Sequence, residues 1–338
     1  MVVLRVSDGT NSDDITVTVT VTNTVIDITA NSANLAENAA ADADVLTMAS
    51  TGDAMNGAGF SISTNGADGD SDGNLPFKIT AASGLVEVND ADDIDRETTA
   101  SYTLVITVSD GTAAVTENVV ITITDINDNT PEFDDDDSDG STATAAASVA
   151  ENVQAVGTYD GTDADSGDTL TYTIRTSGEN AASVDHDLFS IVSGSGVLTF
   201  GSAPNFEAPG CGAGNDANTC VVVLRVSDGT NSDDITVTVT VTAVNDNTPE
   251  FDDDDSDGST ATAAASVAEN TQAVGTYDGT DSDAADTLTY TIRTASENAA
   301  SVDHDLFSIV SGSGVLTFAS APNFEAPGCG AGNDANTC

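Results

Sequence analysis

The sequence predicts an all-β protein made of tandem β-sandwich repeats. Thr alternates with Val or Ile over residues 15–22, and similar alternation recurs over residues 104–108 and 170–174, which places an apolar face inward and a polar face outward on half-buried strands. Gly and Asp clusters separate these runs, and no long segment has apolar residues at helical spacing. Residues 151–200 recur almost unchanged as residues 269–318. Such a repeat is typical of an array of modules.

The internal repeats divide the chain into four segments. Residues 2–22 are identical to residues 222–242, so we expect residues 1–22 to be the C-terminal strand hairpin of a preceding or neighbouring repeat. The other segments are predicted to be a divergent repeat (23–124), a second repeat (125–242) and a third repeat (243–338). Because the third ends where the counterpart of residues 222–242 would follow, we expect it to lack its last two strands.

A sandwich without those strands would expose its apolar core and two unpaired edges, which is an aggregation hazard. Two hypotheses for what fills the gap remain open. In the first, the N-terminal hairpin of the next copy donates its strands and produces a head-to-tail filament, because the contact is heterologous and need not close. In the second, the 338 residues are one unit cut from a longer covalent array. Both hypotheses place the segment in a polymer.

A dense set of oxygen ligands follows the strand predicted over residues 119–124. Residues 125–129 are Asp-Ile-Asn-Asp-Asn, and Pro131 then fixes an extended exit. Calcium takes six to eight oxygens from carboxylates, amides and carbonyls, whereas zinc would need His or Cys. Calcium (Ca²⁺) is therefore the expected metal. A second copy of the stretch begins with Ala243 in place of the first Asp.

Residues 125–133 resemble the inter-domain linker of cadherin repeats, Asp-x-Asn-Asp-Asn-x-Pro-x-Phe, at every specified position. Three other motifs resemble the same family and occur in the expected order: Glu37-Asn38, residues 77–79 followed by Gly84, and the Asp-Arg-Glu of residues 95–97. The resemblance covers nearly all of the chain. It implies Greek-key, immunoglobulin-like sandwiches joined by calcium-binding linkers. The stretch 22–27 lacks the Asn-Asp-Asn signature, so no full calcium cluster is expected at that junction.

The resemblance also implies a ligand set for each junction, with three ions at a complete one. The first junction would use Glu37, Asp95, Glu97, Asp125, Asn127, Asp128, Asn129, Asp163, Asp165 and Asp228. The second would use Glu151, Glu207, Asn245, Asp246, Asn247, Asp281 and Asp283, with Asp8 of a following copy in the place that Asp228 takes in the first. Asn205 and Ala243 stand where carboxylates are expected. Weaker or fewer ions are therefore predicted at the second junction.

The composition restricts the possible partners. The chain has 57 acidic and 6 basic residues, a formal net charge of −51, which excludes nucleic acid as a partner and disfavours anionic membranes. Outside the linkers, a solvated surface adapted to saline water explains the acidity equally well. No run of 18 apolar residues exists, so no direct membrane insertion of this segment is predicted.

The four cysteines form two pairs with identical spacing, Cys211 with Cys220 and Cys329 with Cys338. Each pair is interpreted as a local disulfide, because a zinc site would need four such ligands and only two are near one another. Disulfides imply an oxidising, extracellular compartment.

No phosphate-binding loop, nucleophile elbow or Cys/His pairing is present, so the protein is not expected to be an enzyme. The predicted function is a calcium-stiffened structural repeat unit of an extracellular head-to-tail filament or surface fibre, with copies of itself and Ca²⁺ ions as partners. Scarce Lys and nearly identical repeats look more like a microbial surface protein than an animal adhesion receptor. The alternative function is an adhesin stalk or binding module that mediates cell-cell or cell-surface adhesion.

Overall fold

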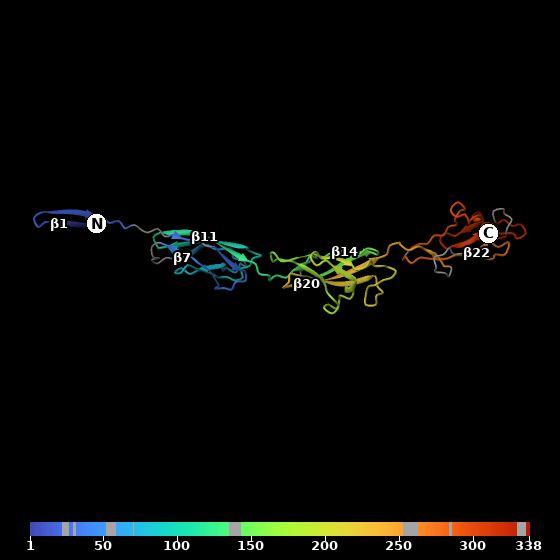
Figure 1. Cartoon of the computed structure of the whole chain (residues 1–338), viewed down its shortest axis with the longest axis horizontal. Helices are drawn as coiled ribbons and strands as arrows, with labels where there is room; N and C mark the ends of the chain where they lie inside the picture. Colours follow the sequence, from blue (N-terminus) through green and yellow to red (C-terminus); the bar gives the residue numbers. More distant parts are fainter. Residues whose placement is uncertain are drawn as a thin grey trace. The chain divides into compact units, whose positions relative to one another are not determined.

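The computed structural model describes residues 1–21, 27–29, 32–51, 59–69, 71–134, 143–252, 263–283, 286–329 and 336–338 (Figure 1). The chain separates into two compact units. Unit 1 contains Met1–Glu132, Thr162–Leu170 and Ser227–Ser232, and unit 2 contains Phe133–Gly161, Thr171–Val226 and Asp233–Cys338. The junction predicted to lack calcium, residues 22–27, lies almost wholly outside the described residues.

Unit 1 begins with an antiparallel hairpin formed by β1 (Val2–Ser7) and β2 (Ser12–Val17). The ladder runs from Val2 opposite Val17 to Ser7 opposite Ser12. The alternating pattern predicts a strand continuing to residue 22, but β2 ends at Val17. In the identical sequence of residues 222–242 the second strand continues to Thr242, and a further strand pairs with it there. The length of the strand is therefore set by its partner.

The strands between residues 27 and 124 of unit 1 form a β-sandwich, named here the first sandwich. A four-stranded sheet has the order β4-β11-β10-β7, in which β4 runs parallel to β11. A three-stranded sheet has the order β5-β9-β8, and β3 pairs with β6. The strands are β3 (Asp27–Ile28), β4 (Ser32–Ala36), β5 (Asp44–Thr47), β6 (Ser50–Thr51), β7 (Gly59–Thr64), β8 (Phe77–Ile79), β9 (Leu85–Val88), β10 (Ser101–Ser109) and β11 (Ala114–Thr124). Leu104, Ile106, Ile121 and Val86 are fully buried in its core.

A second sandwich spans residues 132–242. Its four-stranded sheet has the order β13-β20-β19-β16, and its three-stranded sheet has the order β14-β18-β17. The strands are β12 (Glu132–Phe133), β13 (Ala143–Ala150), β14 (Ala155–Thr158), β15 (Gly161–Thr162), β16 (Thr171–Ile174), β17 (Phe189–Ile191), β18 (Val197–Phe200), β19 (Thr219–Ser227) and β20 (Ser232–Thr242), with a 3₁₀ turn η1 (His186–Leu188) before β17. The central strands β19 and β20 contribute fully buried side chains such as Leu224 and Val237.

The last part of unit 2, named here the third sheet group, has only half of this architecture. Its three-stranded sheet has the order β22-β25-β24, and β21 pairs with β23. The elements are β21 (Glu250–Phe251), β22 (Ala273–Thr276), β23 (Gly279–Thr280), η2 (His304–Leu306), β24 (Phe307–Ile309) and β25 (Val315–Phe318). None of the described residues of this group forms a counterpart of β13, β16, β19 or β20.

The structure confirms the all-β prediction, since strands and short 3₁₀ turns are the regular elements of the described chain. Disulfides join Cys211 to Cys220 and Cys329 to Cys338, as the spacing predicts. The repeat boundaries at residues 23, 125 and 243 stay a prediction. In the part of the chain that is described, no helix has the length and apolarity needed to cross a bilayer.

Candidate metal centre

A buried glutamate organises the first junction. Glu37 follows directly after β4 and is 2% exposed. Its carboxylate accepts hydrogen bonds from the backbone N–H groups of Arg96 (2.8 Å) and Ile126. The chain can turn away because the next residue, Asn38, has a left-handed φ of 56°, which Asn tolerates better than most residues. Glu37 thus fixes the end of β4 against two later segments.

Four carboxylates meet around Glu37. One oxygen each from Glu37, Glu97, Asp128 and Asp165 lies within 4.8 Å of the other three; we call this the Glu37 cluster. Two unit charges at this distance repel by roughly 3–4 kcal/mol at an effective dielectric of 20. Desolvation raises the pKa of Glu97 to about 7, and a side-chain hydrogen bond with Glu37 contributes to the same shift. The cluster therefore holds more negative charge than its environment stabilises without a cation.

A second group of carboxylates shares Asp165 with the first. One oxygen each from Asp163, Asp165, Asp168 and Asp228 also lies within 4.8 Å of the others; we call this the Asp163 cluster. Desolvation raises the pKa of Asp163. Among the described residues, one buried oxygen of Asp163 and one of Asp228 have no hydrogen-bond partner. Buried oxygens in this state are costly unless a ligand completes them. Asp165 can bridge two cations because it belongs to both clusters.

The linker amides bring the two clusters together. Asn129 donates its backbone N–H (2.8 Å) and its side-chain amide (2.7 Å) to Asp165, and Asp128 donates its backbone N–H to the same carboxylate. The side-chain amide of Asn127 donates to Asp168, while its Oδ1 is buried without a hydrogen-bond partner in the described structure. The linker is thus held on the 162–170 loop through the same carboxylates that form the clusters.

Two carboxylates of the predicted ligand set, Asp95 and Asp125, lie outside both clusters. Asp95 caps its own turn, with its carboxylate accepting from the backbone of Glu97 (2.9 Å) and from the Thr98 hydroxyl (2.7 Å). Hydrogen bonding to Thr98 lowers the pKa of Asp95. Asp125 faces Arg96, whose Nε is 3.6 Å from its carboxylate. The structure gives both carboxylates partners other than the clustered acids.

The second junction, within unit 2, repeats this arrangement with fewer charges. Glu151, Glu207, Asp246 and Asp283 form the Glu151 cluster, again with one oxygen of each within 4.8 Å of the others. Glu151 is 1% exposed and accepts the N–H groups of Phe206 (2.9 Å) and Val244 (2.7 Å), which lower its pKa. Desolvation raises the pKa of Glu207, and both of its carboxylate oxygens are buried without a hydrogen bond in the described chain.

The counterpart of the Asp163 cluster has three members. Asp281, Asp283 and Asp286 form the Asp281 cluster, with no equivalent of Asp228 among the described residues. Asn247 donates its side-chain amide (2.8 Å) and backbone N–H (2.9 Å) to Asp283, and Asn245 donates to Asp286. The side-chain bond from Asn247 lowers the pKa of Asp283.

Asp8, predicted to act from a neighbouring copy, lies in the β1–β2 turn. Its carboxylate accepts the N–H groups of Thr10 (2.8 Å) and Asn11 (2.7 Å), which lowers its pKa. Asp228 accepts the corresponding N–H groups of Thr230 and Asn231, both at 2.6 Å. Asp8 belongs to none of the carboxylate clusters of the described chain. The two turns have the same shape, so an identical turn presents Asp8 as it presents Asp228.

Sequence analysis missed Asp168 and Asp286 as members of clusters. They follow Asp165 and Asp283 by three residues, and the 118-residue repeat relates one to the other. The signal was their recurrence in both repeats. Asn38 and Asn152 were also missed as neighbours of the metal centre. Their side-chain amides donate to Asp128 and Asp246.

The donor set determines which metal fits. All clustered side chains offer carboxylate oxygens, with amide oxygen available at Asn127. Such hard oxygen donors suit Ca²⁺ or Mg²⁺ rather than Zn²⁺, and the many carboxylates at unequal positions suit the flexible shell of Ca²⁺ better than the strict octahedron of Mg²⁺. The residues present therefore fit calcium.

Solved structures resemble this chain, although no protein-family model and no curated protein matches its sequence. Human CDH23 repeats EC21–23 are 18% identical, with 90% of this chain and 94% of that chain covered and a TM-score of 0.59. Protocadherin gamma B2 extracellular cadherin domains 3–6 are 20% identical, with 95% and 74% covered and a TM-score of 0.62. The human desmocollin-1 ectodomain is 23% identical, with 88% and 54% covered and a TM-score of 0.57.

These likenesses place the chain in a fold class. It has the fold of cadherin extracellular repeats, a tandem series of Greek-key β-sandwiches. The predicted fold class is confirmed, and the resemblance to cadherin repeats is confirmed at the level of the fold.

Proposed function

We propose that the chain is a calcium-stiffened structural repeat unit of an extracellular filament or surface fibre. In this proposal residues 23–124, 125–242 and 243–338 are successive repeats, and residues 1–22 belong to a neighbouring repeat. The observation that carries the proposal is the meeting of two carboxylate clusters at one shared residue, Asp165, beside the linker. A single bridging carboxylate can hold two cations in a fixed relation to the linker.

The proposed stiffening depends on the ligands coming from separate segments of the chain. Glu37 lies at the end of β4, Asp128 lies in the linker, and Asp165 lies in the loop of residues 162–170. A cation bound by these three would tie three separate segments together. Without it their mutual repulsion favours separation. Calcium would therefore convert a flexible connection into a rigid one.

An extracellular location is supported by two features. The disulfides at Cys211 and Cys329 are of a kind that persists in oxidising compartments. Extracellular calcium-binding modules also work with dissociation constants of about 0.1–1 mM, which suits sites that fill outside the cell. A microbial surface is the proposed setting, as the scarce Lys and nearly identical repeats indicate.

A second candidate function is an adhesive binding module. Protocadherin gammaB7 EC3–6, which was solved as a cis-dimer, matches with a TM-score of 0.62. Large apolar side chains such as Val6 and Phe251 are also exposed in this chain, and exposed apolar surface is typical of protein-protein contacts. Binding of the isolated chain to cells or immobilised glycans would favour this function over the fibre.

Calcium titration of the full chain tests the main proposal. We expect Asp165→Asn to weaken calcium binding more than Asp163→Asn, because Asp165 belongs to two clusters and Asp163 to one. The matched control is Asp187→Asn, since that side chain is exposed and lies outside every cluster. Isothermal titration calorimetry measures affinity and stoichiometry, and small-angle scattering with and without a chelator measures stiffness.

Two results would contradict the proposal. One is calcium binding by Asp165→Asn with wild-type stoichiometry and affinity. The other is a scattering profile that a chelator leaves unchanged, since a connection already rigid without metal needs no ion.

A further inference from the structure

We propose that the β1–β2 hairpin of one copy inserts into the groove of the third sheet group of a second copy, in the place that β19 and β20 take in the second sandwich. The inference rests on the proposed function in one respect, because it supplies the contact that joins successive units of the fibre. The occupant is a second copy of this chain, and the argument depends on surfaces that the described residues present.

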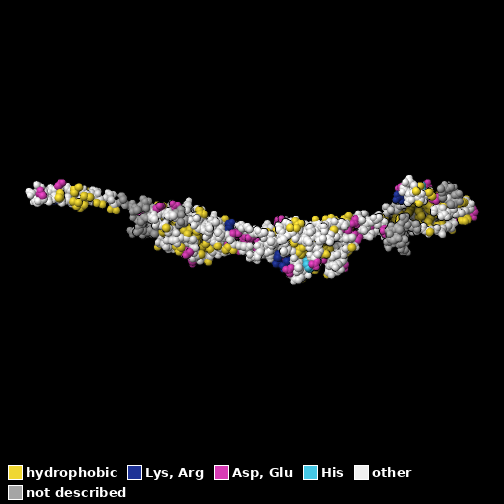
Figure 2. All heavy atoms as spheres, in the orientation of Figure 1, with side chains coloured by type: hydrophobic (Ala, Val, Ile, Leu, Met, Phe, Trp, Pro, Cys, Tyr) yellow, Lys and Arg dark blue, Asp and Glu magenta, His cyan; other side chains and the backbone are white. Residues whose placement is uncertain are grey.

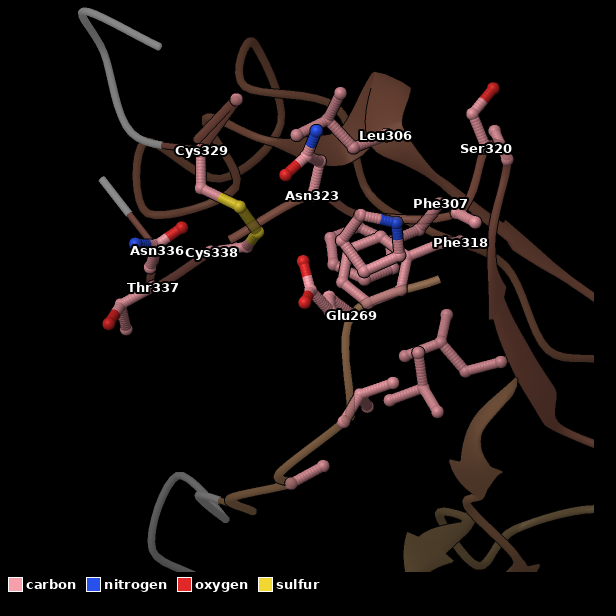
Figure 3. Close-up of a pocket in the computed structure, with 18 of the residues that line it drawn as sticks. Glu269, Leu306, Phe307, Phe318, Ser320, Asn323, Cys329, Asn336, Thr337 and Cys338 are labelled. Atoms are coloured by element: carbon pink, nitrogen blue, oxygen red, sulfur yellow. A yellow bond between two sulfur atoms is a disulfide. The ribbon is translucent and has the colours of Figure 1, made fainter. Parts of the chain in front are cut away.

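The groove lies where the four-stranded sheet of a complete sandwich would be. It encloses about 910 Å³ and is lined by Val267, Leu306, Phe318 and Phe324, with the Cys329–Cys338 disulfide at its edge (Figure 3). The rings of Phe307 and Phe318 lie with their centroids 4.6 Å apart on its wall. Figure 2 shows a hollow with hydrophobic side chains in this part of the molecule. An apolar opening of this size needs a cover.

The second sandwich shows what covers the same surface. There β19 and β20 lie between β13 and β16, and Tyr172 of β16 and Leu198 and Phe200 of β18 are buried. Their counterparts in the third sheet group are Tyr290, Leu316 and Phe318, and all three are partly exposed. The difference in burial is located where β19 and β20 would lie.

The hairpin carries the sequence that fills the groove. Residues 2–22 are identical to residues 222–242, which include most of β19 and all of β20. Ile15 is 62% exposed where Ile235 is 2% exposed, and Val19 is 68% exposed where Val239 is 0% exposed. Figure 2 shows hydrophobic side chains along this hairpin. The hairpin is therefore a preformed strand pair with an uncovered apolar face.

The register of the inserted strands follows from the second sandwich. There β13 and β20 are parallel, with Ala145 opposite Val237 and Ser148 opposite Thr240. The same pairing in the third sheet group places Ala263 opposite Val17 and Ser266 opposite Thr20 of the donor. Residues 18–21 lie beyond β2, so insertion would lengthen this strand.

Charged and polar groups fit the same register. The Nε of Arg175 is 3.7 Å from Asp234, which also pairs with Arg225. Arg293 corresponds to Arg175, and Asp14 of the donor corresponds to Asp234. Asp14 already pairs with Arg5, the counterpart of Arg225. The inserted hairpin would bring its acidic group to the basic side chain of the groove.

A serine has different hydrogen-bond partners in the second sandwich and in the third sheet group. Ser183 Oγ accepts the backbone N–H of Val223 at 3.0 Å. The corresponding Ser301 Oγ donates to the carbonyl of Arg293 instead. The donor residue in the position of Val223 is Val3, so insertion would return this hydroxyl to its role as an acceptor.

The contact is heterologous, because the hairpin and the groove are different surfaces of the chain. Copies joined in this way form an open series unless the rotation between them closes a ring. The geometry therefore points to a head-to-tail polymer rather than a two-fold dimer.

A cysteine pair tests the register in the full chain. The variant carries Thr20→Cys and Ser266→Cys, which the proposed pairing places on adjacent strands about 4.8 Å apart, within disulfide reach. The matched control carries Thr16→Cys and Ser266→Cys, in which a shift of four residues separates the pair by roughly 13 Å. After mild oxidation we expect the first variant to form a ladder of cross-linked chains on a non-reducing denaturing gel, and the control to remain monomeric.

Three outcomes would overturn the inference. They are a first variant that stays monomeric, equal cross-linking in both variants, and a cross-link confined within one chain. Hydrogen exchange of the unmodified chain gives a second measurement, in which residues 2–21 become protected as concentration rises. Protection that does not depend on concentration also contradicts the inference.

Oxidation in calcium and in a chelator separates this inference from the proposed function. Cross-linking in both solutions with no calcium binding would support strand insertion and contradict calcium stiffening. Calcium binding without any cross-link would support the stiffened junction and contradict strand insertion.

Discussion

Residues 132–220 of the second sandwich and residues 250–338 of the third sheet group have nearly the same sequence, yet they differ in structure. Residues 171–174 and 289–292 are both Thr-Tyr-Thr-Ile, yet the first are the strand β16 and the second have no strand structure. Residues 145–150 belong to β13, while the identical residues 263–268 are also without strand structure. In both cases the strand exists where β19 or β20 pairs with it. A β-strand is therefore specified by its partner as much as by its own residues.

The largest expected difference comes from substituting the isoleucine that occupies the same position in the two identical stretches, Ile15 and Ile235. Ile235→Asp places an unpaired carboxylate in the core of the second sandwich, and we expect a loss of about 4 kcal/mol or more in its free energy of unfolding. Ile15→Asp makes the same change in the exposed hairpin. It should alter unfolding of the dilute chain by less than about 0.5 kcal/mol and abolish association.

Chemical denaturation followed by circular dichroism measures the first effect, and sedimentation velocity measures the second. Ile15→Thr is the conservative control, because Thr keeps the β-branched shape. If Ile15→Asp associated like the unmodified chain, the hairpin would have no part in assembly.

The two disulfides extend the comparison with a smaller effect. Each closes a loop with a sequence separation of 9 residues. Replacing Cys211 and Cys220 by Ser should destabilise the second sandwich by about 2–3 kcal/mol. The same change at Cys329 and Cys338 should shift unfolding less, because fewer strands depend on it. Denaturant midpoints of the two double variants measure this, and equal shifts would show that the third sheet group is as well ordered as the second sandwich.

Placing a carboxylate at residue 243, where the first junction has Asp125, tests why calcium binding is expected to be weaker at the second junction. Ala243→Asp should tighten calcium binding at the second junction by on the order of tenfold, because affinity rises with the number of charged ligands. Asp125 at the first junction faces Arg96, whereas Phe206 occupies the corresponding position at the second. The new carboxylate would therefore act without a competing cation.

Calorimetric titration measures this gain, and Ala243→Asn is the uncharged control of similar size. A gain from Asn as large as that from Asp would assign the effect to shape rather than charge.

The smallest effect concerns the two identical turns. Asp228→Asn should weaken calcium binding at the Asp163 cluster by on the order of tenfold in a dilute chain, because a ligand charge is removed. Asp8→Asn should leave the dilute chain unchanged and weaken calcium binding a few-fold only in associated material. Asn keeps the hydrogen bonds that shape each turn. Calcium titration at low and high protein concentration tests the pair, and an equal effect of Asp8→Asn at both would separate calcium binding from assembly.

Much of the fold could be predicted from the sequence, because the local pattern of apolar residues agrees with the strands that form in the folded protein. The alternation over residues 104–108 predicts a strand, and β10 alternates between buried and less buried residues along its length. The extent of β2 and the absence of strands at residues 263–268 and 289–292 could not be predicted from the local pattern. They depend on whether a neighbouring strand is present, and neither their own residues nor their spacing contain that information.

Like the fold, the candidate site could be predicted from the sequence only in part. The resemblance to cadherin repeats implied Asp128 and Asp165 as ligands, and the structure brings them together. It also implied Asp95 and Asp125, which have other hydrogen-bond or ion-pair partners in this structure. Asp168 was missed because its approach to Asp165 depends on how the loop of residues 162–170 folds. Sequence order gives the carboxylates but not the direction in which each one points.

The identity of the hairpin with residues 222–242 also creates competition. Under the proposed insertion, a free hairpin competes with β19 and β20 for their place in the second sandwich, because residues 2–22 and 222–242 are identical. The native strands have the advantage of covalent attachment, and the Cys211–Cys220 disulfide holds the start of β19 in place. Tethering of this kind corresponds to an effective concentration in the millimolar range, about a thousand times that of a free copy at micromolar concentration. If hairpins insert as proposed, this disulfide would favour the native pairing in the second sandwich and leave the groove of the third sheet group as the preferred site for an incoming hairpin.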